Sequence, residues 1–415
     1  MVDDDLYGNK ARYGKILERI DHITEKPTRA KYYCKNPINT QYFKKLIPYF
    51  DAKDLSYIRR NRVLYFLTMI TYVIEKDLKD CDREDINKLV AFTHITNKTA
   101  YSKGDTVKEI KIIWKILFPE RDSLGRMDET IVPYVVRHLS RKVDKSKEKL
   151  RNDRVTWPEF EKILGFFSGD KRIQAYLMLA LESLGRPQEI LYTKIKNYEF
   201  HDNFAKIWIA EHGKEGTGFL QCIDSYPYVQ EWYQQHPFKH NPNAYFFING
   251  RGRGNYEQLK NSYINKLLSH ACKTLQIDKH ITCYSLKRNG VTFRRQRGDS
   301  DVQIQHAARW TSTKQLKVYD MTTQEDALKI ELEKRGMVST VGKEKFDSKV
   351  KCCIFCAHNN GFTAEFCVNC KRPLNREKID EMAQTHERMI NHDMIQRFDR
   401  IERIFESMVG KKAGL

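Results

Sequence analysis

The stretch from Ile281 to Tyr319 constrains the fold more than any other part of the chain. Polar and basic residues open it and lead into a helical pattern, Leu286–Arg297. A Gly-Asp-Ser-Asp turn separates this pattern from a second short helical one, after which comes Trp310. Nine residues later, Tyr319 ends a basic segment. A phenolic oxygen can attack a phosphodiester when cationic donors hold the developing charge, and this stretch supplies both kinds of group.

Tyr319 taken alone is weak evidence for such chemistry. The chain contains 22 tyrosines, and most of them must pack in cores or lie on the surface. The interpretation therefore depends on the residues that accompany Tyr319 in this stretch. They are Tyr284, Lys287 and Arg288 at the start of the first helical pattern, and Trp310 before the basic segment.

The charge of the chain favours a polyanionic partner. Lys and Arg outnumber Asp and Glu by 73 to 54, which gives a net charge of +19. Nucleic acid is the simplest partner for this surplus, although a merely soluble basic protein would share it. The longest apolar run, Val63–Ile74, is too short to span a bilayer, and the acidic N-terminus lacks the apolar core of a secretion signal. We therefore expect a cytoplasmic, nucleoid-associated protein without a membrane partner.

Cysteine spacing predicts one metal site. Five of the ten cysteines are scattered, and the other five crowd between residues 352 and 370. Two Cys-x2-Cys pairs stand ten residues apart there, a spacing typical of a tetrahedral, structural Zn²⁺ site. Cys352 and His358 compete for ligand positions but do not keep the paired spacing. The predicted zinc ligands are Cys353, Cys356, Cys367 and Cys370.

The fold class predicted from these patterns is mainly α with a small β-sheet (α+β). Residues 36–142 carry four amphipathic helical patterns, and an almost wholly charged segment follows them. The expected parts are an N-terminal extension (1–35), a helical domain (36–142), a charged linker (143–154), a second domain (155–335), a zinc-binding segment (350–374) and a C-terminal helix (375–415).

Two further basic positions stand out in the second domain. Arg186 follows a glycine at the start of a helical pattern, where its guanidinium could meet phosphate oxygens, and Glu189 lies one turn further on. Lys214 lies in a glycine-rich turn between two predicted strands. A surface salt bridge and an ordinary hairpin turn would explain these features equally simply.

In combination, these residues resemble the tyrosine recombinase (phage-type integrase) family. In that family a His-x-x-Arg box opens a helix, a Gly-His or Gly-Trp position follows, and the nucleophilic tyrosine lies nine residues on. Trp310 and Tyr319 keep this interval, whereas the box falls on Tyr284 and Lys287 and departs from the family at both positions. The segment 236–250 and the cysteine pairs look like archaeal members with a C-terminal zinc ribbon, which implies an archaeal mobile element.

The resemblance implies a helical core-binding domain over 36–142, a catalytic domain over 155–335 and a zinc ribbon over 350–374. It implies that Tyr319 attacks DNA to form a 3′-phosphotyrosyl bond, with no metal or ATP needed for strand transfer. Arg186, Lys287 and Arg288 would neutralise the phosphate, and Lys214 would protonate the leaving oxygen. The remaining implied roles are a hydrogen bond to phosphate from Tyr284 and packing against it by Trp310.

The implied partner is a double-stranded DNA recombination site on which four protomers assemble. The C-terminal helix supports self-association, because apolar residues recur along it at coiled-coil spacing; they are Met394, Phe398, Ile401, Phe405 and Met408. Two alternatives stay open, since Lys287 is a weaker phosphate ligand than arginine. One is a catalytically silent, sequence-specific DNA-binding protein, and the other is an enzyme similar to type IB topoisomerases.

Overall fold

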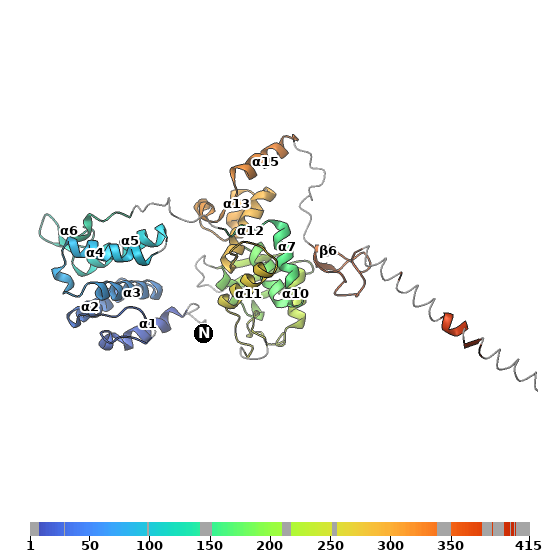
Figure 1. Ribbon diagram of the computed structural model, residues 1–415, viewed down its shortest axis with the longest axis horizontal. Coiled ribbons are helices and arrows are strands. Elements are labelled where there is room, and N and C mark those ends of the chain that lie inside the picture. The colour runs from blue at the N-terminus through green and yellow to red at the C-terminus, as the bar shows by residue number, and fades with distance from the viewer. Residues whose placement is uncertain are drawn as a thin grey trace, which may run out of the picture. The chain divides into compact units, whose positions relative to one another are not determined.

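The computed structural model divides the chain into two compact units, Met1–Leu150 and Arg151–Leu415 (Figure 1). None of the described helices combines the length and apolar character that crossing a bilayer requires. The structure describes residues 8–28, 30–97, 99–141, 152–209, 217–250, 255–337 and 350–375, and in the tail residues 384, 394–398, 400, 401 and 403.

The first unit is a helical bundle (Figure 1), and a short antiparallel hairpin joins two of its helices. Capping residues set its helix starts: Asp82 forms a capping box with Asp85, and Thr99 accepts a hydrogen bond from the Ser102 amide. The elements are α1 (Asn9–Glu18), α2 (Thr40–Ala52), α3 (Tyr57–Val73), α4 (Arg83–Thr96), α5 (Ala100–Leu117), β1 (Glu120–Arg121), β2 (Met127–Asp128) and α6 (Tyr134–Arg137).

The four helices predicted for this unit correspond to α2, α3, α4 and α5. Their apolar faces meet in one core, where Phe50, Leu67 and Trp114 are buried. Tyr13 and Ile20, from the segment expected to be an N-terminal extension, lie in the same core. Residues 8–23 are therefore part of the bundle, because burying these side chains removes apolar surface from water.

The second unit surrounds a three-stranded antiparallel sheet of order β3-β4-β5 with helices. In the sheet, Ile207 pairs with Leu220, and both side chains are buried. The elements are α7 (Trp157–Phe166), α8 (Lys171–Glu182), α9 (Pro187–Leu191), β3 (Tyr198–Phe200), β4 (Ala205–Ile209), β5 (Gly218–Cys222), α10 (Tyr226–Gln235), α11 (Asn261–Thr274), α12 (Cys283–Arg297), α13 (Asp301–Ala307), α14 (Leu316–Tyr319) and α15 (Gln324–Lys334).

Helices α8 and α12 cross at a close contact that positions the functional side chains. A Cβ on Gly290 would lie 2.0 Å from the carbonyl oxygen of Leu181, so only glycine fits at this crossing. Gly290 lies on α12, and Leu181 lies in the last turn of α8, just before the α9 segment. The crossing therefore fixes the first turns of α12 and α9 relative to each other.

The cysteine-rich segment forms a small ribbon on the second unit. Its strands β6 (Val350–Cys352) and β7 (Asn359–Gly361) pair antiparallel. Tyr228 on α10 exchanges hydrogen bonds with Thr363, which follows β7: the two hydroxyls are 3.0 Å apart, and the Thr363 amide donates to the Tyr228 oxygen at 3.3 Å. The ribbon is thus seated on α10.

The predicted fold class, mainly helical with a small sheet, is confirmed. Helix α11 begins at Asn261, and Gln258, three residues before it, forms an antiparallel β-bridge with Ile248. Most of the charged linker and part of the tail lie outside the described residues. Residues 152–154 of the expected linker pack on the second unit, where Arg154 is 2.7 Å from Asp326 of α15.

Candidate active site

The first turn of α12 buries a lysine between two aromatic rings. Thr282 caps this helix with Ser285 in a capping box, which sets the rotation of the turn that follows. Lys287 is 0% exposed, and its Nζ lies 5.5 Å from the ring centroid of Trp310 and 5.2 Å from that of Tyr319. Because burying an ammonium group is costly, the negative faces of the two rings offset part of its desolvation.

Tyr319, the last residue of α14, completes this aromatic pair. Its ring centroid lies 5.2 Å from that of Trp310. The Tyr319 ring is also partly buried against the small hydrophobic core to which Trp310 belongs. The Nε1 of Trp310 is buried and finds no hydrogen-bond acceptor among the described residues. A buried N–H that lacks an acceptor is suited to binding an anionic oxygen beside the tyrosine.

Arg186 stands at the N-cap of α9 and is held by Glu189 one turn further on. The Arg186 amide donates to Glu189 Oε2 at 2.8 Å, and Nη1 of Arg186 lies 3.5 Å from Oε1. The Arg186 side chain is 9% exposed and that of Glu189 is fully buried. Glu189 therefore orients Arg186 through both its backbone amide and its guanidinium.

Arg309 is a cation of this site that the sequence reasoning did not identify. Its Nη2 lies 2.8 Å from Oε2 of Glu189, and its side chain is 8% exposed. Two arginines from distant parts of the chain thus share one buried carboxylate. In the sequence, Arg309 stands out merely as a departure from the resembled family, which carries glycine immediately before the Trp310 position; its contact with Glu189 is not apparent there.

Tyr284 connects the two helices that carry these cations. Its hydroxyl donates to Oε1 of Gln188 on α9 at 3.0 Å, and the side chain is 39% exposed. Burial raises the pKa of Tyr284, the proximity of Tyr319 acts in the same direction, and Arg186 opposes both. Tyr284 is therefore a neutral hydroxyl at the entrance of the site, able to donate a hydrogen bond.

Two predicted site residues are not joined to this group by the described contacts. Arg288 forms an ion pair with buried Asp153 and also donates to the Ser285 hydroxyl, so it ties the start of the unit to α12. Lys214 lies outside the described residues. The strands that flank its turn are described, and Ile209 pairs with Gly218 at the base of the hairpin.

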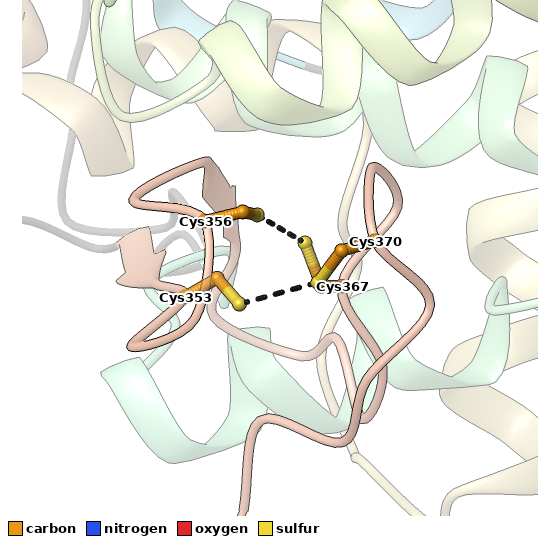
Figure 2. Close-up of side chains that lie close together, drawn as sticks. All are labelled: Cys353, Cys356, Cys367 and Cys370. Carbon is orange, nitrogen blue, oxygen red and sulfur yellow. Dashed lines mark hydrogen bonds between the residues drawn. The ribbon is translucent and has the colours of Figure 1, made fainter.

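The four predicted metal ligands converge at one point of the ribbon. Their sulfur atoms all lie within 4.8 Å of one another, and Figure 2 shows them facing a common centre from two loops. Sulfur separations are 3.6 Å for both Cys353–Cys370 and Cys356–Cys367. Tetrahedral coordination with bonds of about 2.3 Å requires roughly 3.8 Å between sulfurs, so the set fits a tetrahedral metal ion.

The ribbon also prepares thiolates for such an ion. Burial raises the pKa of Cys367, but hydrogen bonds from the backbone N–H groups of Cys370 and Asn369 outweigh it and lower the pKa to about 6. Cys352 is exposed, and its Sγ approaches the carbonyl oxygen of Ala357 rather than the cluster. His358 also lies outside the four-sulfur group. The structure therefore selects the paired cysteines over both competitors.

Taken together, the second unit offers a tyrosine hydroxyl beside three buried cations. Tyr319 and Lys287 are in direct contact, and Arg186 and Arg309 are joined through Glu189. Tyr284 links these two halves through its bond to Gln188. Such a set can hold a phosphodiester and stabilise the additional negative charge that builds up when an oxygen attacks phosphorus.

Comparison with known proteins agrees with this geometry. Residues 154–326 match the model of the phage integrase family. Among curated protein sequences, none matches this chain.

Solved structures share its fold. A XerH site-specific recombinase, in a post-cleavage complex with palindromic difH substrate, is 15% identical with a TM-score of 0.52 over 83% of this chain and 98% of that one. A lambda integrase tetramer bound to a Holliday junction is 14% identical with a TM-score of 0.52 over 74% and 86%. The integrase of the Tn1549 transposon, in complex with transposon right-end DNA, is 13% identical with a TM-score of 0.51 over 72% and 99%.

Proposed function

The segment 154–326 is a domain of the phage integrase family, and on this premise we propose that the chain is a site-specific DNA recombinase of the tyrosine type. It breaks and rejoins double-stranded DNA through a 3′-phosphotyrosyl intermediate. The observation that carries the proposal is the contact of Tyr319 with buried Lys287 and Trp310 beside the Arg186–Glu189 pair.

In the proposed cleavage step, Oη of Tyr319 forms a bond to the scissile phosphorus as the bond to the 5′ oxygen breaks. The phenol gives up its proton, and the leaving 5′ oxygen takes one up, with Lys214 as the proposed donor. Arg186 and Lys287 stabilise the charge on the non-bridging oxygens, and Nε1 of Trp310 and the hydroxyl of Tyr284 donate to them. A 5′ hydroxyl of the partner strand then reverses the step, so neither metal nor ATP is consumed.

The metal belongs to the ribbon in this proposal. Zn²⁺ is the ion that best suits four thiolates in tetrahedral arrangement, and a site closed by four protein ligands is structural. Cys353, Cys356, Cys367 and Cys370 would hold it. Metal binding would hold together the two loops that carry the cysteine pairs, which have few other buried apolar side chains. Because β7 follows the first of these loops, the metal would also support the contact of the ribbon with α10.

Assembly on DNA is part of the same proposal, with a synaptic tetramer as the working form. The tail supports it, because Met394, Phe398 and Ile401 are exposed on described helical residues at coiled-coil spacing. Phe405 and Met408, which would continue this seam, lie outside the described residues. A chain that lacks residues 376–415 should bind DNA but sediment as a smaller complex, and unchanged sedimentation would exclude the tail as the contact.

Covalent trapping tests the function directly. Nicked duplexes carrying sites selected from a random library by the full-length protein would be incubated with wild type and with Tyr319→Phe, then separated under denaturing conditions. We expect a protein–DNA adduct that Tyr319→Phe abolishes. Tight, salt-sensitive binding without an adduct would instead favour a silent DNA-binding protein. Relaxation of any supercoiled plasmid, without preference for the selected site, would favour an enzyme similar to type IB topoisomerases.

A further inference from the structure

We infer that Arg309 is a catalytic residue of the proposed reaction, a second guanidinium that contacts the scissile phosphate and makes up for the lysine at position 287. The inference rests on the proposed function.

The local fold at the end of α13 calls for glycine at position 309. The Trp310 amide donates to the carbonyl of Gln305 at 2.9 Å, and the Arg309 amide donates to that of His306 at 3.0 Å. This pair of bonds is the Schellman arrangement, in which the residue after the C-cap adopts the left-handed conformation and is usually glycine. Arg309 does so with a φ of 57°. An L-residue is strained there, so the side chain must supply something that glycine lacks.

The contacts of the side chain indicate what it supplies. Arg309 Nη2 lies 2.8 Å from Oε2 of Glu189, the carboxylate that also holds Arg186. Both arginine side chains are more than nine-tenths buried, and Glu189 is completely so. One carboxylate therefore orients two guanidinium groups that come from opposite ends of the domain sequence.

The position of Arg309 places it among the reacting groups. It precedes Trp310, whose ring contacts Tyr319. Its Cδ lies 3.2 Å from where a Cβ on Gly218 would stand, at the base of the hairpin that carries Lys214. Arg309 thus lies near Arg186 of the α9 segment, the rings of Trp310 and Tyr319, and the base of the β4–β5 hairpin. A guanidinium has five N–H donors and can bind a carboxylate and a phosphate at the same time.

The chemistry explains why a second arginine is needed. A lysine presents a point charge, whereas arginine presents a planar fork that matches two phosphate oxygens. Lys287 is packed between two rings and provides charge without the fork. Arg309 supplies the missing guanidinium from a different element. Two guanidinium groups, those of Arg186 and Arg309, then bind the phosphate, as they would if position 287 were arginine.

The test compares two substrates that differ by one charge. Tyr319 adduct formation on a library-selected site would be measured for full-length wild type, Arg309→Gly and Arg309→Lys. Arg335→Gln serves as the charge control, because Arg335 is an exposed arginine just after the end of α15. The same site would carry either a phosphodiester or a neutral methylphosphonate at the scissile position. Glycine suits the backbone at position 309, so thermal unfolding should show that Arg309→Gly remains folded.

On the phosphodiester, we expect Arg309→Gly to be 10²- to 10³-fold slower than wild type, with Arg309→Lys only partly restored and Arg335→Gln unchanged. On the methylphosphonate, Arg309→Gly should come within about tenfold of wild type, because there is less charge to neutralise. Equal loss on both substrates would show a merely structural role, and a rate near wild type on the phosphodiester would show no role; either overturns the inference. Without an adduct from wild type, the proposed function itself fails, and the inference with it.

Discussion

The ring of Tyr228 fills the space in which any side chain at position 361 would begin: a Cβ on Gly361 would lie 2.5 Å from Cζ of Tyr228. The contact continues on both sides of this point. The ring of Phe362 lies 5.6 Å from that of Trp157 on α7, and the side-chain Nδ2 of Asn359 donates to Oδ1 of Asn203 at 2.7 Å. The cysteine ribbon therefore packs closely against the rest of the second unit, and this close packing requires glycine at position 361.

Gly361→Ala should release the ribbon from α10. The added methyl group meets the ring of Tyr228 at a distance that real atoms do not adopt, and relief of such a clash costs about 1–3 kcal/mol. Faster hydrogen exchange of β7 and a changed fluorescence of Trp157 would report the release. Gly165→Ala serves as the matched control, since a Cβ there meets nothing within 4 Å. Equal behaviour of the two variants would show that the ribbon is not held by this contact.

The metal site predicts one tightly bound ion per chain. Substitution with Co²⁺ should give the absorption of a tetrahedral thiolate complex, because four sulfur ligands surround the site. Cys367→Ser should lose that signal and the bound zinc, whereas Cys352→Ser should keep both. A chelator should unfold the ribbon in wild type, as metal binding and folding are coupled in small sites. Retention of a full equivalent of zinc by Cys367→Ser would contradict the ligand assignment.

Lys287→Met should separate stability from activity. Methionine keeps the length and packing of the side chain but removes a buried charge, so the melting temperature should stay equal or rise. Adduct formation should fall by about 10²-fold or more, since one donor to the phosphate is lost. Lys314→Met removes the same charge from an exposed position and should leave both quantities near wild type. A large drop in melting temperature would mean that Lys287 serves mainly to hold the fold.

Acid should weaken the attachment of α15. The hydrogen bond and charge of Arg154 lower the pKa of Asp326, with further help from Thr323, although burial opposes them. A carboxyl whose pKa is depressed by folding stabilises the protein above its unfolded pKa of about 3.9 and loses this contribution as pH falls through the folded value. Urea unfolding of wild type and Asp326→Asn should therefore differ at pH 6, and the difference should shrink progressively as pH falls below about 3.9. A difference between wild type and Asp326→Asn that stays constant over this pH range would refute the linkage.

Local patterns predicted most of the fold because the signals lie within one or two helical turns. Caps such as Asp82 and Thr156 are readable from neighbouring residues, and the paired cysteines carry their own geometry. Features set by distant contacts were not readable. Arg309 gains its meaning from Glu189, 120 residues earlier, and Arg288 is drawn to Asp153 across 135 residues.

The same limit applies to the start of the chain. Residues 8–23 have a weak helical pattern, and it is their packing in the core, such as that of Tyr13 on the ring of Tyr57, that shows that they belong to the bundle. At the site itself, the resemblance supplied Tyr319, Trp310 and Arg186, and the structure joins Tyr319 and Trp310 in direct contact. The resemblance could not supply Arg309, because this residue stands where the family has glycine.

The tight crossing of α8 and α12 at Gly290 has a consequence for the newly made chain. Arg186 is synthesised about a hundred residues before Lys287, and Tyr319 follows later still. Until α12 has been synthesised, Leu181 on α8 lacks the helix that packs against it. The side chains of the site are then not held in position relative to one another. A nascent or truncated chain that ends before Tyr319 therefore cannot cut DNA by the proposed route, and the site is completed only late in synthesis.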